Sequence, residues 1–122
     1  MIKLLQHTRR PDITFCRNGR ILITARVAHI LSLSPGDSIN VAFIDLEYLL
    51  YAVRHENNIG RHVAQCYPTK KHSRNYCANS VELCRYMLSI ANVSTDRVSL
   101  MAGEPITRND TVYIPIIYQC PL

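Results

Sequence analysis

The sequence predicts an α+β fold that is mostly β, on the basis of three observations. Short segments with alternating apolar and polar residues recur along the chain, and such alternation is typical of half-buried strands. An Asn-Gly pair at 18–19 separates two of these segments, as in a tight hairpin. The best helical pattern covers only residues 80–91. With 122 residues, 48% of them hydrophobic, the chain can bury a core as one domain or as a module with an extension.

The first predicted elements are two strands and a short helix. Residues 13–16 form one strand, and residues 20–24 return beside it after the Asn-Gly turn. Thr24 is then expected to cap a short helix through its side-chain oxygen. This helix presents a single apolar face, because three of its apolar residues are spaced three and four positions apart: Val27, Ile30 and Leu31.

A Pro-Gly-Asp run at 35–37 ends this helix and turns the chain into two further strands. The strand at 38–43 is expected to point three apolar side chains inward: Ile39, Val41 and Phe43. Residues 47–53 are apolar on both faces, which is typical of a central strand or of a strand buried at an interface. A helix over 46–54 is the alternative, because short apolar runs are ambiguous.

The second half is predicted to add strands and one helix. Asn79 and Glu82 have the spacing of a capping box, which opens the helix at 80–91. Pro115 lacks a backbone N–H, so we expect it at a sheet edge or a bulge. The other predicted segments are a loop at 54–60, a possible strand at 61–67, a basic loop at 68–75, and strands at 97–101 and 111–118.

The net charge of +5 is concentrated in two blocks of the chain. Residues 1–26 carry six Lys and Arg against one carboxylate, and residues 54–74 carry five against one. Between them, residues 27–53 carry three carboxylates and no Lys or Arg. Two basic blocks suit a polyanion such as nucleic acid, and a solubilising surface is the alternative interpretation.

Residues 19–41 resemble a known motif without gaps. Gly19-Arg20-Ile21-x-Ile23 is followed in register by Leu31-x-Leu33-x-Pro35-Gly36-Asp37 and by the alternating Ile39 and Val41. This pattern resembles the AbrB-like swapped-hairpin family of DNA-binding proteins, which also contains many antitoxins. Thr24 stands where the family usually has proline, and Ala28 where it usually has a basic residue.

The resemblance covers residues 13–54, one third of the chain, and it implies a homodimer. In that family two chains interleave their hairpins into one barrel-like body, which would cover the apolar face that two short strands cannot bury alone. The chain is therefore divided into a swapped-hairpin-like module at 1–54 and an α+β extension at 55–122. The extension is either a separate unit or part of the same compact domain.

We therefore predict a small cytoplasmic, non-enzymatic DNA-binding protein, such as a transcriptional regulator or an antitoxin-like protein. Arginine and lysine would supply the affinity through phosphate contacts. The candidate contacts are Arg9, Arg10, Arg17, Arg20 and Arg26, with a second set at Lys70, Lys71 and Arg74. The alternative is a protein-interaction or assembly module without nucleic-acid binding, in which residues 55–122 bind a protein partner.

The remaining motifs argue against other classes of function. No nucleophile elbow, phosphate-binding glycine loop or metalloprotease motif is present, so no catalytic residue is predicted. The five cysteines are an odd number without dense spacing, which favours reduced thiols. No apolar run approaches the roughly 20 residues that span a bilayer. Zinc is a weaker alternative, because the spacing of its possible ligands fits no standard finger: His62, Cys66, His72 and Cys77. No metal or cofactor is predicted.

Overall fold

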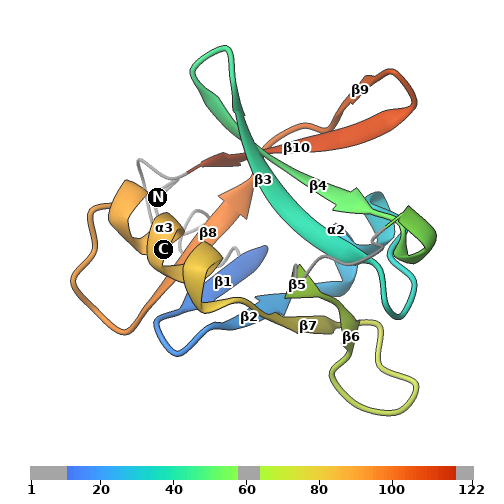
Figure 1. The fold of residues 1–122 in the computed structure, drawn as a ribbon, viewed down its shortest axis with the longest axis horizontal. Coiled ribbons are helices and arrows are strands. Elements are labelled where there is room, and N and C mark those ends of the chain that lie inside the picture. Colours follow the sequence, from blue (N-terminus) through green and yellow to red (C-terminus); the bar gives the residue numbers. More distant parts are fainter. Residues whose placement is uncertain (1–10, 58–63, 118–122) are drawn as a thin grey trace, which may run out of the picture.

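The computed structural model describes residues 11–57 and 64–117, and these residues form a mostly-β fold. Ten antiparallel strands make one sheet that curls into a nearly closed barrel, with two short helices packed beside it (Figure 1). The predicted mostly-β class is confirmed. The order of the first elements is also as predicted: a hairpin, a short helix, the Pro-Gly-Asp turn and then a pair of strands.

The helices are α2 (Ala25–Ile30) and α3 (Val81–Ile90), and a 3₁₀ turn, η1, covers His55–Asn57. The strands of the sheet are β1 (Ile13–Cys16), β2 (Arg20–Ile23), β3 (Ser38–Ile44), β4 (Glu47–Val53), β5 (Ala64–Gln65), β6 (Tyr67–Pro68), β7 (Tyr76–Asn79), β8 (Arg97–Ala102), β9 (Ile106–Arg108) and β10 (Thr111–Ile117).

The barrel is nearly closed because the two end strands of the sheet are consecutive in the chain. The strand order is β5-β3-β4-β10-β8-β1-β2-β7-β6, and only Cys66 separates β5 from β6. The N–H of Cys66 donates to the carbonyl of Asp37 at 2.7 Å, and the N–H of Gly36 donates back to Cys66 at 2.8 Å. The predicted Pro-Gly-Asp turn therefore fastens this junction, and Gly36 has the positive φ of 94° that favours glycine there.

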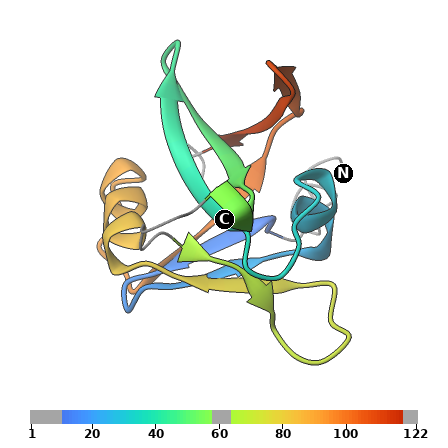
Figure 2. The ribbon, with the colours of Figure 1, turned by 45° about the vertical axis from the view of Figure 1, so that its right-hand side comes forward.

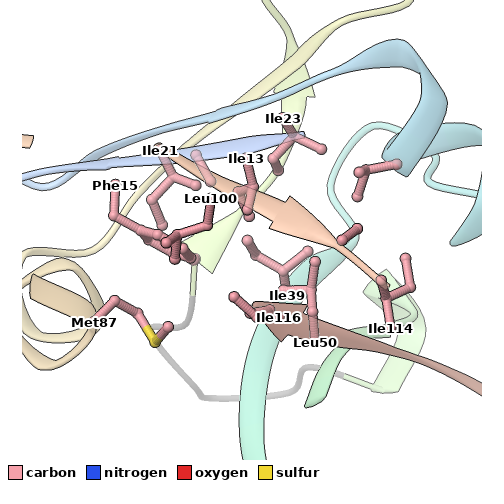
Figure 3. Packing of buried hydrophobic residues seen from close by; sticks show 14 of the residues in the cluster. Ile13, Phe15, Ile21, Ile23, Ile39, Leu50, Met87, Leu100, Ile114 and Ile116 are labelled. Atoms are coloured by element: carbon pink, nitrogen blue, oxygen red, sulfur yellow. The ribbon is translucent and has the colours of Figure 1, made fainter. Parts of the chain in front are cut away.

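Strands from both halves of the sequence alternate in this one sheet. The hairpin β1–β2 lies between β8 and β7, and β4 lies beside β10. The inner face of the hairpin packs against the second half of the same chain, where Phe15 and Ile21 join Met87 of α3 and Leu100 of β8 in the core (Figure 3). Within the described residues, the apolar face that called for a partner is thus covered by its own chain.

The strand prediction for 38–43 is correct in extent, but its inward face was wrong at one position. Ile39 is 1% exposed, whereas Phe43 is 53% exposed. The reason is that the far ends of β3 and β4 leave the barrel as a protruding hairpin (Figure 2). Beyond the barrel wall, alternation of apolar residues no longer corresponds to burial. The segment 47–53 is a strand and not the alternative helix, with Leu49 and Leu50 both buried on its two faces.

Both predicted helix caps were wrong in detail. The cap of α3 is Ser80, whose hydroxyl accepts the N–H of Leu83 at 3.1 Å, so the expected Asn79 box is shifted by one residue. Thr24 occupies the cap position of α2, but its hydroxyl donates to the carbonyl of Asp12 at 3.1 Å instead of capping the helix. The hydrogen bond to Asp12 orients the hydroxyl away from the N–H groups of the first helical turn, so it replaces the expected capping bond.

Pro115 is not on an edge strand, because β10 lies between β4 and β8. Its carbonyl accepts the N–H of Gly103 at 2.7 Å, so its nitrogen faces the break between β8 and β9, where the ladder needs no donor.

Of the possible strand at 61–67, only the β5 and β6 residues pair, and 61–63 lie outside the described residues. The hairpin β9–β10 was not predicted; its Asn109-Asp110 turn, with both residues at positive φ, was the available signal.

Candidate nucleic-acid interface

Helix α2 and the loop 69–75 between β6 and β7 face each other across a basic cleft of about 820 Å³. Two arginines and one histidine line it: Arg26, His29 and Arg74. All three are exposed, and no carboxylate is among the described residues that line this cleft. We name this region the α2–loop surface: Arg26, His29, Lys70, Lys71 and Arg74.

The loop is held in a defined shape against α2. The N–H of Thr69 donates to the carbonyl of Asn75 at 2.9 Å, which closes the loop at its base. The side chain of Asn75 accepts the N–H of Ala25 at 2.8 Å and so ties the loop to the start of α2. Lys70 and Lys71 are exposed at its far end. The two predicted basic sets therefore meet at this surface through Arg26 and Arg74.

His29 belongs to this surface and is not among the predicted contacts. It follows Arg26 by three residues on α2, and residues so spaced lie on one face of a helix. That spacing was the signal that could have found it.

Arg26 is not a free cation. Its Nη1 donates to Oδ1 of Asp12 at 3.0 Å, and its side chain is 52% exposed whereas that of Asp12 is 6% exposed. Oδ2 of Asp12 accepts the N–H of Ala102 at 2.8 Å, which anchors the carboxylate to β8. Arg26 therefore presents an oriented guanidinium whose charge is partly compensated.

A second, more apolar cleft of about 880 Å³ adjoins the first, and both are lined by Ala25, Arg26 and Tyr76. Its other walls come from the start of β1, the end of β2 and the loop 69–75. We name it the apolar cleft, because Ile13, Leu22 and Ile23 supply much of its wall. Its lining also includes Asp12, Thr14, Thr24, Thr69 and Asn75.

The other predicted contacts lie elsewhere. Arg17 and Arg20 flank the β1–β2 turn, at the opposite end of β2 from Arg26. Nη2 of Arg17 donates to the carbonyl of Thr95 at 2.9 Å, and Arg20 lies on β2 opposite Asn79 of β7. Arg9 and Arg10 lie outside the described residues. The predicted basic residues thus form two separate groups.

A second buried carboxylate, Asp37, accepts three donors. These are the N–H of Ser34 at 2.9 Å, the N–H of His55 at 2.9 Å and Nη1 of Arg54 at 2.7 Å. Burial alone would raise the pKa of Asp37, but these hydrogen bonds and the positive charge of Arg54 together lower it from its ordinary value. Asp37 is therefore ionised and holds the end of α2 against the end of β4.

The two buried thiols, Cys66 and Cys84, do not have the lowered pKa of a nucleophile. Burial raises the pKa of Cys66 to about 12 and that of Cys84 to about 11, so both are protonated at neutral pH. Across residues 11–57 and 64–117, no three His, Cys, Asp or Glu side chains gather closely enough to hold a metal ion. His62, one of the four possible zinc ligands, lies outside that range.

Comparison with models of known protein families, with curated proteins and with solved structures finds no match. No helix within the described ranges is long and apolar enough to cross a membrane.

Proposed function

We propose that this chain is a non-enzymatic DNA-binding protein that contacts the phosphate backbone through the α2–loop surface. The observation that carries the proposal is the placement of Arg26, His29 and Arg74 in one cleft, beside the exposed Lys70 and Lys71. Phosphates are bound by such clusters of Arg and Lys, and release of DNA counterions supplies most of the affinity.

The distribution of carboxylates supports the same surface. The described residues 64–79 carry three Lys and Arg and no carboxylate. Three exposed carboxylates, Asp45, Glu47 and Asp110, lie on the β3–β4 and β9–β10 hairpins, which protrude away from the loop 69–75 (Figures 1 and 2). A duplex approaching the α2–loop surface would therefore meet little like-charge repulsion.

The resemblance of residues 13–54 to the AbrB-like family is a further reason to prefer DNA over other polyanions. A swapped-hairpin homodimer, and a role as a regulator or antitoxin-like protein, stay predictions from that resemblance. The hairpin is already covered within its own chain, so the proposal of DNA binding requires no second copy. The mass of the protein in solution tests the dimer separately.

The test compares two charge reversals of equal size. Lys70→Glu/Lys71→Glu changes the α2–loop surface, and Arg17→Glu/Arg20→Glu changes the β1–β2 turn by the same net charge. Fluorescence anisotropy with a labelled duplex at low salt should show a loss of at least about tenfold in affinity for the first variant and a much smaller loss for the second. Equal losses would indicate attraction by net charge alone and would contradict the proposed surface.

Arg74→Glu offers an independent check, because Arg74 lines the cleft whereas the two lysines are on the outer part of the loop. We expect it to weaken binding to all duplex sequences alike, as a phosphate contact does. A change in sequence preference without loss of overall affinity would instead place Arg74 against base edges.

The interaction-module alternative keeps one observation in its favour. The tip of the β3–β4 hairpin exposes large apolar side chains, and exposed apolar patches mark contact surfaces. This alternative would be supported if a pull-down with this chain recovered a stoichiometric protein partner and the chain bound no duplex DNA at low salt.

A further inference from the structure

The tip of the β3–β4 hairpin combines two unfavourable features that the fold does not explain. The two-residue turn places Asp45 at φ 51° and Leu46 at φ 66°. Such turns favour Gly, Asn or Asp, because a larger side chain is strained at positive φ. Leu46 is also 82% exposed. Strain and exposure at one leucine suggest a contact outside the chain.

The apolar surface continues from this tip along the hairpin. Phe43 is 53% exposed, its ring lies 4.6 Å from that of Tyr48, and Tyr48 lies 6.1 Å from Tyr86 of α3. Two carboxylates flank the leucine, those of Asp45 and Glu47. Arg108 approaches Asp45 only at 3.7 Å, with both side chains more than half exposed, so the tip keeps acidic character.

The apolar cleft has the complementary properties. Its 880 Å³ is in the range of pockets that hold ligands, and the half-buried Leu22 contributes to its apolar lining. Arg26 and Asp12, which pair with each other, also line it. The loop 69–75 supplies Thr69 and Asn75 to one wall, and the exposed Lys70, Lys71 and Arg74 lie on the same loop outside the lining. An acidic tip with a leucine at its centre therefore matches the apolar wall of this cleft in polarity and the adjoining basic loop in charge.

The tip and the loop 69–75 lie at opposite ends of the molecule in both views (Figures 1 and 2). The hairpin of one copy therefore cannot reach the cleft beside the loop of that same copy. An anionic membrane would be a poor binding partner for the tip, since its negative charge repels the carboxylates that flank Leu46.

We propose that the β3–β4 tip of one copy binds in the apolar cleft of a second copy, with Leu46 against Leu22 and with Asp45 and Glu47 facing the basic wall. Two different surfaces meet in this contact, so it is head-to-tail and not a two-fold pairing. The inference goes beyond DNA binding and does not depend on it. Because both processes use the region around Arg26, duplex DNA should compete with self-association.

Sedimentation velocity of the full chain over a wide range of concentrations tests the contact. We expect the average mass to rise with concentration for the wild type. Leu46→Gly should weaken association by at least about tenfold, as loss of a central anchor does. Its thermal stability should be equal or higher, because glycine relieves the positive φ. Leu22→Glu should weaken association similarly, by repelling the acidic tip.

Val81→Ala is the matched control, since Val81 is a 45%-exposed apolar residue on α3 outside both surfaces. It should leave association unchanged. Association that falls equally in this control would indicate general apolar adhesion and would overturn the proposal.

Mixing the two variants decides the geometry. Leu22→Glu has an intact tip and Leu46→Gly an intact cleft. At concentrations where each variant alone is monomeric, the mixture should therefore form one-to-one pairs and nothing larger. A wild-type mass independent of concentration would overturn the inference, including a constant dimer that Leu46→Gly leaves intact. Mixtures that stay monomeric while the wild type associates would overturn it too. Loss of DNA binding in Lys70→Glu/Lys71→Glu has no bearing on either result.

Discussion

Two ion pairs, Asp37–Arg54 and Asp12–Arg26, look alike in composition and differ in what surrounds them. Each joins a buried carboxylate to an arginine whose side chain is about half exposed. Arg54 also donates to the carbonyls of Leu31 at 2.6 Å and Ser32 at 2.7 Å, so its guanidinium is hydrogen-bonded to the residues that follow α2. Arg26 lines the two clefts beside the loop 69–75, whereas Arg54 lines a separate, smaller cleft of about 500 Å³.

This difference teaches which cations of a basic protein are available to a ligand. A guanidinium bonded to a carboxylate and two carbonyls has its main donor directions occupied. Arg26 has one described carboxylate partner and donors left that can face a phosphate. We therefore assign Arg54 to stability and Arg26 to the candidate interface.

Asp37→Ala should give the largest effect. It leaves the N–H groups of Ser34 and His55 without their acceptor and removes the carboxylate partner of the half-exposed Arg54, so we expect a loss of about 3 kcal/mol. Urea denaturation monitored by circular dichroism measures the loss. Glu104→Ala, at an exposed carboxylate, should change the free energy of unfolding by less than about 0.5 kcal/mol. A similar value for Asp37→Ala would mean that its network does not hold α2 to β4.

Asp12→Asn should lower stability less than Asp37→Ala does, and it should increase the affinity for DNA. The amide oxygen can still accept the N–H of Ala102, so we expect a loss of about 1 kcal/mol. Removing the negative charge leaves Arg26 uncompensated, so affinity for duplex DNA should rise several-fold. Anisotropy titration checks this, with Asp37→Asn as the control that should not raise affinity. Weaker binding by Asp12→Asn would show that Asp12 positions Arg26 for its contact.

Acid should destabilise the protein through Asp37. The pKa of Asp37 is lowered in the fold below its ordinary value of 3.8, so the unfolded chain takes up the proton first as the pH falls. The contribution to stability is complete well above pH 3.8 and is lost as the pH falls through that value toward the lower, folded pKa. Melting temperatures measured on both sides of this window should fall less steeply for Asp37→Asn than for the wild type. Parallel curves would contradict the assignment.

Thiol labelling gives the smallest and most local reading. Cys66 is buried, its pKa is about 12, and its N–H donates to the carbonyl of Asp37. It should therefore react slowly in the native protein at mild alkaline pH, and faster in Asp37→Ala than in Asp12→Asn. Site-resolved mass spectrometry follows the rate. Equal acceleration in both variants would mean that the two ion pairs stabilise one common structure.

The sequence predicted local structure well because its signals were local. The Asn-Gly turn, the Pro-Gly-Asp turn and the alternation in β3 each depend on neighbouring residues. The exposure of Phe43 could not be predicted, because it depends on where β3 leaves the barrel. Pairing of β1 with β8 joins residues more than eighty positions apart, and no local pattern encodes it.

The candidate site was predictable only in part for the same reason. Lys70, Lys71 and Arg74 were identifiable as a basic loop, but their approach to Arg26 follows from pairing of β7 with β2. Arg17 and Arg20 are as basic as Arg26 in sequence, yet they lie at the other end of β2. The acceptors of Arg26 and Arg17, on Asp12 and at Thr95, became visible only in the fold.

The most direct test of DNA binding through the α2–loop surface is the salt dependence of affinity. With about four phosphate contacts from this surface, the slope of log K against log salt should be about −3.5, and Lys70→Glu/Lys71→Glu should make it less steep by about two. Arg17→Glu/Arg20→Glu should leave the slope close to that of the wild type. A wild-type affinity without salt dependence, or a slope that only the Arg17/Arg20 variant changes, would contradict the account.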